Sequence, residues 1–236
     1  MDNLNVRQTI DGELEALRRN LLNLANRAGE AVRKALWALC HQDRILAQEV
    51  IDSDDDLDSR ALKIDEECLL FIARFQPVAQ DLRTVSSISH MAIDLERIGD
   101  LGVNVAKFAL KLSDRPFVKP LIDIPRMGEI LQEMIDATMR AFINGDVEEA
   151  KKACALDDPI DDLERQIFRE MLLMMMENPR IIEEGTALIT VARNLERAAD
   201  HVTNLAERVL YAVTGKVVSA SQFRRPKAPR DAAHGR

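Results

Sequence analysis

The sequence consists largely of one unit that occurs twice, with matching positions about 100 residues apart. The segment LERIGD at 95–100 returns as LERAAD at 195–200. Earlier in each copy, ALCHQD at 38–43 matches AFINGD at 141–146. Such self-similarity predicts that the chain builds the same arrangement twice. The matching carboxylates are Asp54, Asp58, Glu96 and Asp100 in the first copy, and Asp157, Asp161, Glu196 and Asp200 in the second.

Apolar spacing and composition both predict helices. Leu14, Leu17, Leu21 and Leu24 recur at the intervals of a helix that buries one face. Apolar residues make up 47% of the chain and aromatic residues only 4%, so aliphatic side chains must fill the core, as in helix-on-helix packing. We therefore predict an all-α fold of two tandem, duplicated three-helix bundles. Its six long helices are expected at residues 9–41, 43–75, 77–112, 127–143, 146–176 and 181–211.

Prolines and composition divide the chain into four parts. Three prolines interrupt the segment between the two units, which is typical of a linker. The C-terminal end is basic, rich in Pro and Ala, and poor in residues to bury, so we expect a disordered tail. Within the first unit, Asp43 is a candidate N-cap and Ser53 a candidate kink. The predicted parts are a first bundle at 1–113, a linker at 114–125, a second bundle at 126–215 and the basic tail at 216–236.

Charge and cysteine usage restrict the function classes. The formal net charge is −8 and the isoelectric point is near 5.2, which disfavours nucleic acid as a direct partner because phosphate binding requires a cationic surface. Three cysteines without a CxxC spacing are typical of buried free thiols in a reducing compartment. The sequence shows neither an apolar run of membrane-spanning length nor a signal-peptide core. We therefore expect a cytoplasmic protein.

The LERIGD segment places its acidic residues on one face of a helix. With Glu96 at zero on a helical wheel, Asp100 falls at about 40° and Asn104 at about 80°. Leu95, Ile98 and neighbouring apolar residues fall on the opposite side, so the carboxylates should point away from the core of their own bundle. The second copy behaves alike. One interpretation is a solvated face whose arginines form weak surface ion pairs.

A metal site is the alternative interpretation of these stripes. Like charges four residues apart destabilise a helix by about 0.2–0.5 kcal/mol per pair, so an unpartnered acidic stripe is unfavourable. If the helix with the D-x-x-x-D pair meets the helix with the E-x-x-x-D pair, each unit gathers four carboxylates, and a cation would relieve their repulsion. Small residues such as Gly99 beside the stripe would let a ligand approach. Carboxylate and amide oxygens are hard ligands that suit magnesium, manganese, calcium or iron.

Histidines do not extend these candidate sites. The four histidines form no cluster with the cysteines, which disfavours structural zinc, and His201 is expected to be a surface residue. A ferritin-like di-iron oxidase would show Glu-x-x-His pairs that face a bundle interior, and this sequence shows neither. A carboxylate-bridged metalloenzyme is therefore disfavoured, while a purely structural helical scaffold stays open.

Taken together, these motifs resemble the PhoU family of phosphate transport system regulators. The resemblance rests on the duplicated three-helix unit, on the D-x-x-[LI]-D pairs, on LERIGD and LERAAD, and on QPVAQDLR at 76–83, and it covers roughly residues 6–211. It implies divalent or trivalent metal ions on the carboxylate clusters, with iron, manganese, magnesium or zinc as candidates. The ligands carried over are Asp54, Asp58, Glu96, Asp100, Asp157, Asp161, Glu196 and Asp200.

The resemblance also implies a function without catalysis. Members of the family link the ATPase of a phosphate-specific ABC transporter to a sensor histidine kinase, and they repress phosphate-starvation genes when phosphate is plentiful. A homodimer is expected for an elongated pair of bundles. The second copy departs from the first in having Ala198 and Ala199 where the first has Ile98 and Gly99, which makes its site the weaker expectation.

Overall fold

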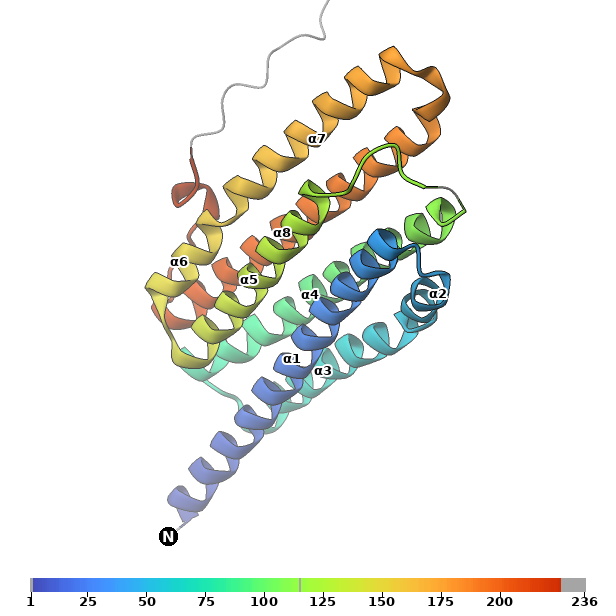
Figure 1. Ribbon diagram of the computed structural model, residues 1–236. Helices are drawn as coiled ribbons and strands as arrows, with labels where there is room; N and C mark the ends of the chain where they lie inside the picture. Colours follow the sequence, from blue (N-terminus) through green and yellow to red (C-terminus); the bar gives the residue numbers. More distant parts are fainter. Residues whose placement is uncertain (1, 115, 226–236) are drawn as a thin grey trace, which may run out of the picture.

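The computed structural model describes residues 2–114 and 116–225 and contains only helices and their connections in these ranges (Figure 1). The first unit comprises α1 (Asp2–His41), α2 (Arg44–Asp52), α3 (Asp54–Phe75) and α4 (Ala79–Leu112). The second comprises α5 (Asp123–Asn144), α6 (Val147–Ala155), α7 (Asp157–Glu177) and α8 (Ile182–Thr214), with 3-10 turns η1 (Pro179–Ile181) and η2 (Ala220–Gln222). The predicted all-α, duplicated fold is confirmed, and the middle helix of each unit is broken once.

The two units start their second helix with the same capping geometry. Asp43 accepts a hydrogen bond from the backbone N–H of Leu46 at 3.0 Å, as the sequence predicted. Asp146 accepts hydrogen bonds from the N–H groups of two residues in the first turn of α6. The residue before each cap, Gln42 or Gly145, has a positive φ of 54° or 64°, which ends the preceding helix. The duplication is therefore visible in the turns as well as in the motifs.

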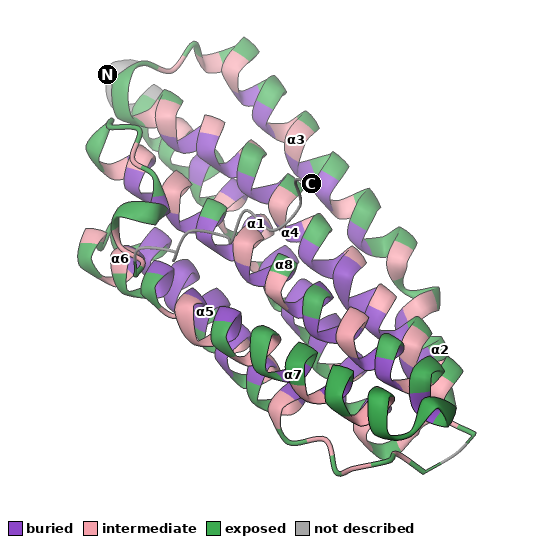
Figure 2. Cartoon of the chain, turned by 90° about the horizontal axis from the view of Figure 1, so that it is seen from above, coloured by how far each residue is buried: buried purple, intermediate pink, exposed green. Residues whose placement is uncertain are grey.

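The first and the last long helix of each unit meet their counterparts in the other unit. Helix α4 contacts α8, and α1 contacts α5. Helix α3 lies on α4 and α1, and α7 lies on α8 and α5, so the two D-x-x-x-D helices flank a central layer (Figure 1). Side chains from both units form one continuous apolar core, including Leu21, Leu95, Met134 and Leu195 (Figure 2).

The wheel assignment of the apolar faces is correct. Leu95 and Ile98 on α4, and Leu195 and Val202 on α8, are at most 1% exposed. Two of the three cysteines, Cys68 and Cys154, are buried as predicted, and burial raises the pKa of each thiol to about 12. Cys40 is only half-buried.

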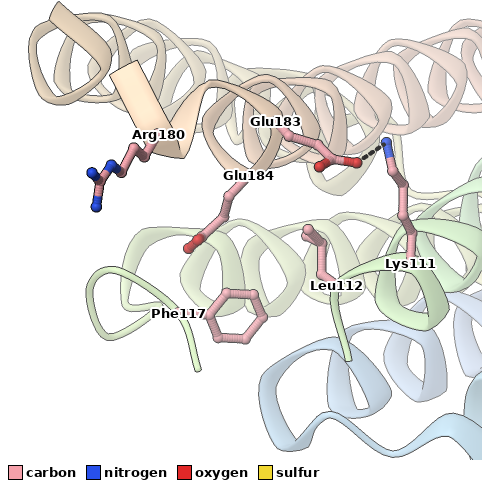
Figure 3. Close-up of a pocket in the computed structure, with 6 residues that line it drawn as sticks. All are labelled: Lys111, Leu112, Phe117, Arg180, Glu183 and Glu184. Atoms are coloured by element: carbon pink, nitrogen blue, oxygen red, sulfur yellow. Dashed lines mark ion pairs between the residues drawn. The ribbon is translucent and has the colours of Figure 1, made fainter. Parts of the chain in front are cut away.

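The linker is shorter than predicted and is held against the second unit. Helix α5 begins at Asp123, so Pro125 lies in its first turn, where no intrahelical N–H bond is lost. The backbone N–H of Val118 donates to Glu184 Oε1 at 2.8 Å. Figure 3 shows the small pocket beside this contact, of about 50 Å³, where Lys111 pairs with Glu183 at 3.2 Å. Because Lys111 pairs with Glu183 and Glu184 accepts from the linker backbone, this pocket is a structural junction.

The ten residues after Gly215 have a defined position, which the composition did not predict. Residues 216–225 contain η2, whose Ala220 is buried against Cys154 and Ala206. Residues 226–236, the rest of the expected disordered tail, lie outside the described residues.

The shared core should make the two units unfold together. Leu205 is fully buried on α8, so Leu205→Ala should lower the free energy of unfolding by about 2–5 kcal/mol. The chain should still show one unfolding transition in a urea titration followed by circular dichroism. Ile45, which is 75% exposed, supplies the control, because Ile45→Ala should change stability by less than about 0.5 kcal/mol. Two separated transitions in the Leu205→Ala protein would show that the units are energetically independent.

Candidate metal centre

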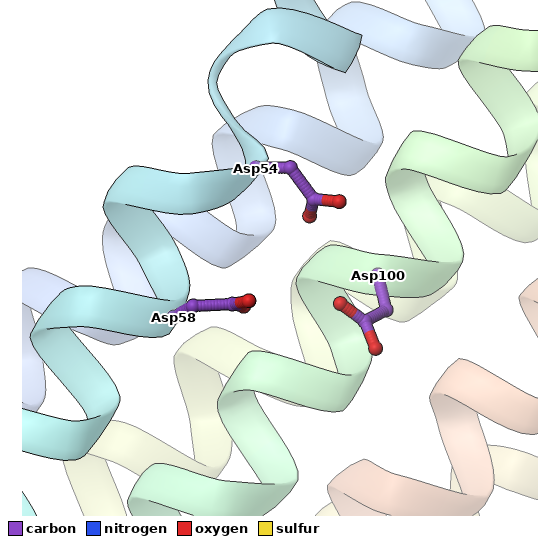
Figure 4. Close-up of side chains that lie close together, drawn as sticks. All are labelled: Asp54, Asp58 and Asp100. Atoms are coloured by element: carbon purple, nitrogen blue, oxygen red, sulfur yellow. The ribbon is translucent and has the colours of Figure 1, made fainter.

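Three carboxylates of the first unit meet in the groove between α3 and α4. Asp54 and Asp58 lie one turn apart on α3, and Asp100 faces them from α4 (Figure 4). One oxygen of each lies within 4.8 Å of the others. Asp54 and Asp100 are half-buried and Asp58 is exposed. The structure thus brings together three of the four residues predicted for this site, and their role as metal ligands stays a prediction.

Glu96, the fourth predicted residue, lies beside this group. It is half-buried, with 18% of its side chain exposed, and it pairs with Arg97 at 3.3 Å. Asp100 shares that arginine at 3.1 Å. The expectation that the stripe points away from the core is correct, but the stripe faces the neighbouring α3 as well as solvent. A helical wheel cannot distinguish these two surroundings, because it describes one helix alone.

Gly99 has a packing role that the sequence analysis missed. A Cβ atom at this position would lie 2.6 Å from Leu57 Cδ1, so the absence of a side chain lets α3 lie close to α4. Leu57 sits between Asp54 and Asp58 on α3 and is buried. The small residue therefore leaves room for the Leu57 side chain, which lies between the two aspartates on α3. The expectation that it opens a path for a ligand has no support in these contacts.

The first cluster is electrostatically strained without a cation. Burial raises the pKa of Asp54, and the charges of Asp100 and Asp58 raise it further, whereas Lys107 lowers it. Burial raises the pKa of Glu96, and the charge of Asp100 raises it further. The charge of Arg97 acts in the opposite direction and lowers that pKa. Asp54 Oδ1 is buried and has no hydrogen-bond partner among the described residues. Hard oxygen donors, mutual repulsion and an unsatisfied buried oxygen together fit a bound divalent or trivalent cation.

The second set of predicted ligands also gathers, but around a guanidinium. Asp157 and Asp161 lie on α7, and Asp200 lies on α8. Arg224, in the segment after α8, forms an ion pair with Asp157 and contacts Asp161 Oδ2 at 3.1 Å and Asp200 Oδ1 at 3.4 Å. Glu196 lies one turn before Asp200 and is half-buried. Sequence analysis missed Arg224 because only the fold brings this basic segment to the acidic groove.

His201 and Asn204 take a structural role between the two units. His201 was expected at the surface, but its side chain is only 26% exposed, and its Nδ1 lies 2.8 Å from Asp94 Oδ1 on α4. Asn204 Nδ2 donates to the same oxygen at 3.3 Å. Because this amide contacts Asp94, it is turned toward the α4–α8 contact. His201 is therefore half-buried at the edge of this contact rather than fully exposed.

These features define a class of protein, an all-α chain with one helical unit duplicated and a carboxylate groove in each copy. The family model described as PhoU domain matches residues 21–109 and again residues 124–209. The chain therefore belongs to the PhoU family, as the motifs indicated. Among the described residues, no helix combines the length and apolar character that a bilayer span requires.

Similar proteins cover nearly the whole of both units. A relative from Deinococcus radiodurans, named phosphate-specific transport system accessory protein PhoU homolog, is 36% identical over 210 residues, 89% of this chain and 99% of the relative. A relative of the same name from Aquifex aeolicus is 39% identical over 206 residues, 87% of this chain and 93% of the relative.

Two solved structures share the fold. The crystal structure of PhoU from Pseudomonas aeruginosa superimposes with a TM-score of 0.83 at 37% identity, covering 87% of this chain and 99% of that one. The structure of the phosphate transport system regulatory protein PhoU from Streptococcus pneumoniae has the same TM-score of 0.83 at 30% identity, covering 89% of this chain and 99% of that one. This chain therefore resembles these proteins in the spatial arrangement of its helices as well as in sequence.

Charge strain in the first cluster should be measurable as a pH-dependent gain of stability. Asp54→Asn removes a carboxylate whose pKa is raised, so the metal-free protein should gain about 0.2–0.5 kcal/mol at pH 7, the typical size of one like-charge pair. A raised carboxyl pKa means that ionisation destabilises the folded state. The gain should therefore be largest above the folded pKa of Asp54 and should vanish below the ordinary value of 3.8.

Thermal melts in a chelator at several pH values would check this expectation. Asp55→Asn is the matched control, because Asp55 lies next along α3 and is exposed. The control should be neutral or slightly destabilising, since an acidic residue in the first turn favours the helix N-terminus. If Asp54→Asn destabilised the metal-free protein at pH 7 as much as the control, the cluster would not be strained.

Proposed function

We propose that this protein is a cytoplasmic regulator of phosphate uptake and of phosphate-starvation signalling. In this role it is a non-catalytic, metal-binding adaptor between the ATPase of a phosphate-specific ABC transporter and a sensor histidine kinase, and it represses starvation genes when phosphate is plentiful. The observation that carries the proposal is the match of both units to the PhoU domain, with relatives named as accessory proteins of phosphate-specific transport. The cluster of Asp54, Asp58 and Asp100 supports metal binding.

The donor set of the first cluster supports binding over catalysis. The described residues bring aspartates together there, and neither histidine nor cysteine belongs to the group. Di-iron oxidases in helical bundles combine carboxylates with histidines that face the bundle interior. Here the carboxylates lie between two helices at the edge of the core, with Asp58 exposed and Asp54 and Asp100 half-buried. Such a site suits a cation that changes surface charge.

Surface charge gives a physical route from metal to partner. Without a cation the groove concentrates negative charge, which repels an acidic or mixed-charge partner. A bound cation is the largest local charge in such a site and reverses that preference. Metal occupancy in the first cluster would therefore change which surfaces can dock along α3 and α4.

Exposed apolar residues on the outer helices support a docking role. Leu62, Leu69 and Leu70 on α3 are each at least 60% exposed. On α7, Leu173 and Met176 are 61% and 73% exposed. Large apolar side chains that cluster on a surface are typical of sites for protein partners. Partner proteins, or a second copy of the chain in a homodimer, would dock on these outer faces, because the inner faces are filled by the shared core.

Metal binding at the first cluster can be tested by removing two ligands. Asp58→Asn with Asp100→Asn should weaken manganese binding at this site at least about tenfold, or about 1.4 kcal/mol, because two of the three clustered carboxylates are lost. Isothermal titration of protein purified in a chelator would measure it. Asp52→Asn with Asp55→Asn is the control, since both residues are exposed and the charge change is identical. Equal binding by the two double variants would rule out this cluster as a metal site.

The adaptor role can be tested in cells that lack the endogenous protein. The wild-type chain should restore repression of a phosphate-starvation reporter in phosphate-rich medium and should co-purify with the transporter ATPase or the kinase. Asp58→Asn with Asp100→Asn should lose at least half of that repression, whereas the exposed control pair should retain it. Full repression by the variant would separate the regulatory role from the metal. Derepression with the wild-type chain would overturn the regulatory role itself.

A further inference from the structure

The segment after α8 forms a strap that closes over the second unit. We define the strap as residues 216–225, which follow the left-handed Gly215 at the end of α8 (Figure 1). Its backbone N–H at Ala220 donates to Glu207 Oε1 at 2.6 Å, and the Phe223 ring lies 5.7 Å from Lys151 Nζ on α6. The strap therefore has an apolar contact, a backbone hydrogen bond and a ring contact before it reaches the acidic groove.

The positively charged side chain of Arg224 extends from the strap into the second cluster. Only 9% of its side chain is exposed, and Asp157, with which it pairs, is fully buried. Its Nη2 atom faces both Asp157 and Asp161, and its Nη1 atom faces Asp200. The planar fork of a guanidinium suits several carboxylates at once. Arg224 therefore contacts three of the four residues predicted as metal ligands in this unit.

The first unit contains no matching arrangement among its described residues. Its cluster is flanked by Arg97, whose side chain is 56% exposed and which lies at the edge of the groove. At the position that corresponds to Glu207, the first unit has Lys107, whose charge lowers the pKa of Asp54. In the second unit, Glu207 at this position binds the strap. In the first unit, Lys107 at the same position partly neutralises the negative charge of the cluster. This exchange of charge suits the first groove to a cation from solution. It suits the second groove to a cation that belongs to the chain itself, the Arg224 guanidinium.

We propose that the second cluster is an arginine-binding site for the strap, and that Arg224 and a metal ion exclude each other there. The reason is geometric. A metal ion must lie about 2.0–2.6 Å from carboxylate oxygens, and the guanidinium already occupies the space in front of Asp161 Oδ2 and Asp200 Oδ1. The strap lies beyond residue 209, where the second match to the family model ends. The proposal concerns the second cluster alone and does not require the adaptor role.

The test is a manganese titration in the full chain with the first cluster disabled. In the Asp58→Asn, Asp100→Asn background, the second cluster is the predicted site that keeps all its carboxylates, and the intact strap should keep its manganese affinity low. Adding Arg224→Gln should raise that affinity at least about tenfold. Arg225→Gln is the matched control, because Arg225 is 68% exposed and pairs only at the edge, with Asp162 at 3.0 Å and Asp158 at 3.7 Å. The control should change the affinity less than about threefold.

A second variant and a second measurement test the proposal even if Arg224→Gln does not fold. If Arg224→Gln does not fold, as a circular dichroism spectrum would show, a chain that ends at Gly215 removes the whole strap and should show the same gain in affinity. In the protein with its native strap, trypsin should cleave the bond between Arg224 and Arg225 slowly. Cleavage should accelerate over the manganese range that fills the second cluster.

Two results would overturn the proposal. One is equal manganese affinity with and without Arg224 in the folded proteins. The other is manganese binding at the second cluster while the Arg224–Arg225 bond stays protected, because the two cations would then coexist. Failure of the proposed function would look different. It would appear as absent manganese binding at the first cluster in the wild-type chain, or as a reporter that stays derepressed when the wild-type chain is supplied.

Discussion

The structure depends on the apolar contact between α4 and α8. The buried faces of these helices meet at the centre of the molecule, and residues such as Leu95 and Leu195 there are at most 1% exposed. Because that contact fixes the rotation of each helix about its own axis, it also fixes where the opposite face points. On α4 the opposite face carries Glu96 and Asp100, and it is turned toward α3. The acidic groove is therefore a geometric result of how the core is filled.

Polar contacts set the register of the same interface. His201 on α8 and Asp94 on α4 lie 2.8 Å apart, and Ser87 Oγ donates to the backbone carbonyl of Arg208 at 3.2 Å. Apolar packing is tolerant of small shifts along a helix, whereas a hydrogen bond is not. These contacts keep the two E-x-x-x-D segments at matching heights. Both grooves consequently open at corresponding places in the two units.

Local patterns in the sequence predicted local features well. Helical periodicity located the buried faces, and Asp43 was identified as a cap because capping depends on residues only three positions apart. Asp54, Asp58 and Asp100 were grouped correctly because two helices of one repeat were expected to meet. The misses concern contacts between distant segments. Neither the packing of Leu57 against Gly99, nor the contact of His201 with Asp94, nor the insertion of Arg224 follows from any periodicity, since each depends on the tertiary arrangement.

The pairing of α1 with α5 and of α4 with α8 has a consequence for symmetry. Contacts of α1 with α5 and of α4 with α8 are those of an isologous interface, in which the same surface of two equal bodies meets itself. The chain is in effect a homodimer whose two subunits are joined covalently. In a true homodimer, one gene fixes both subunits, so any residue that alters one acidic groove alters the other. Covalent joining removes that restriction, and the exchange of Lys107 for Glu207 shows that the two halves have become chemically distinct while keeping one shape.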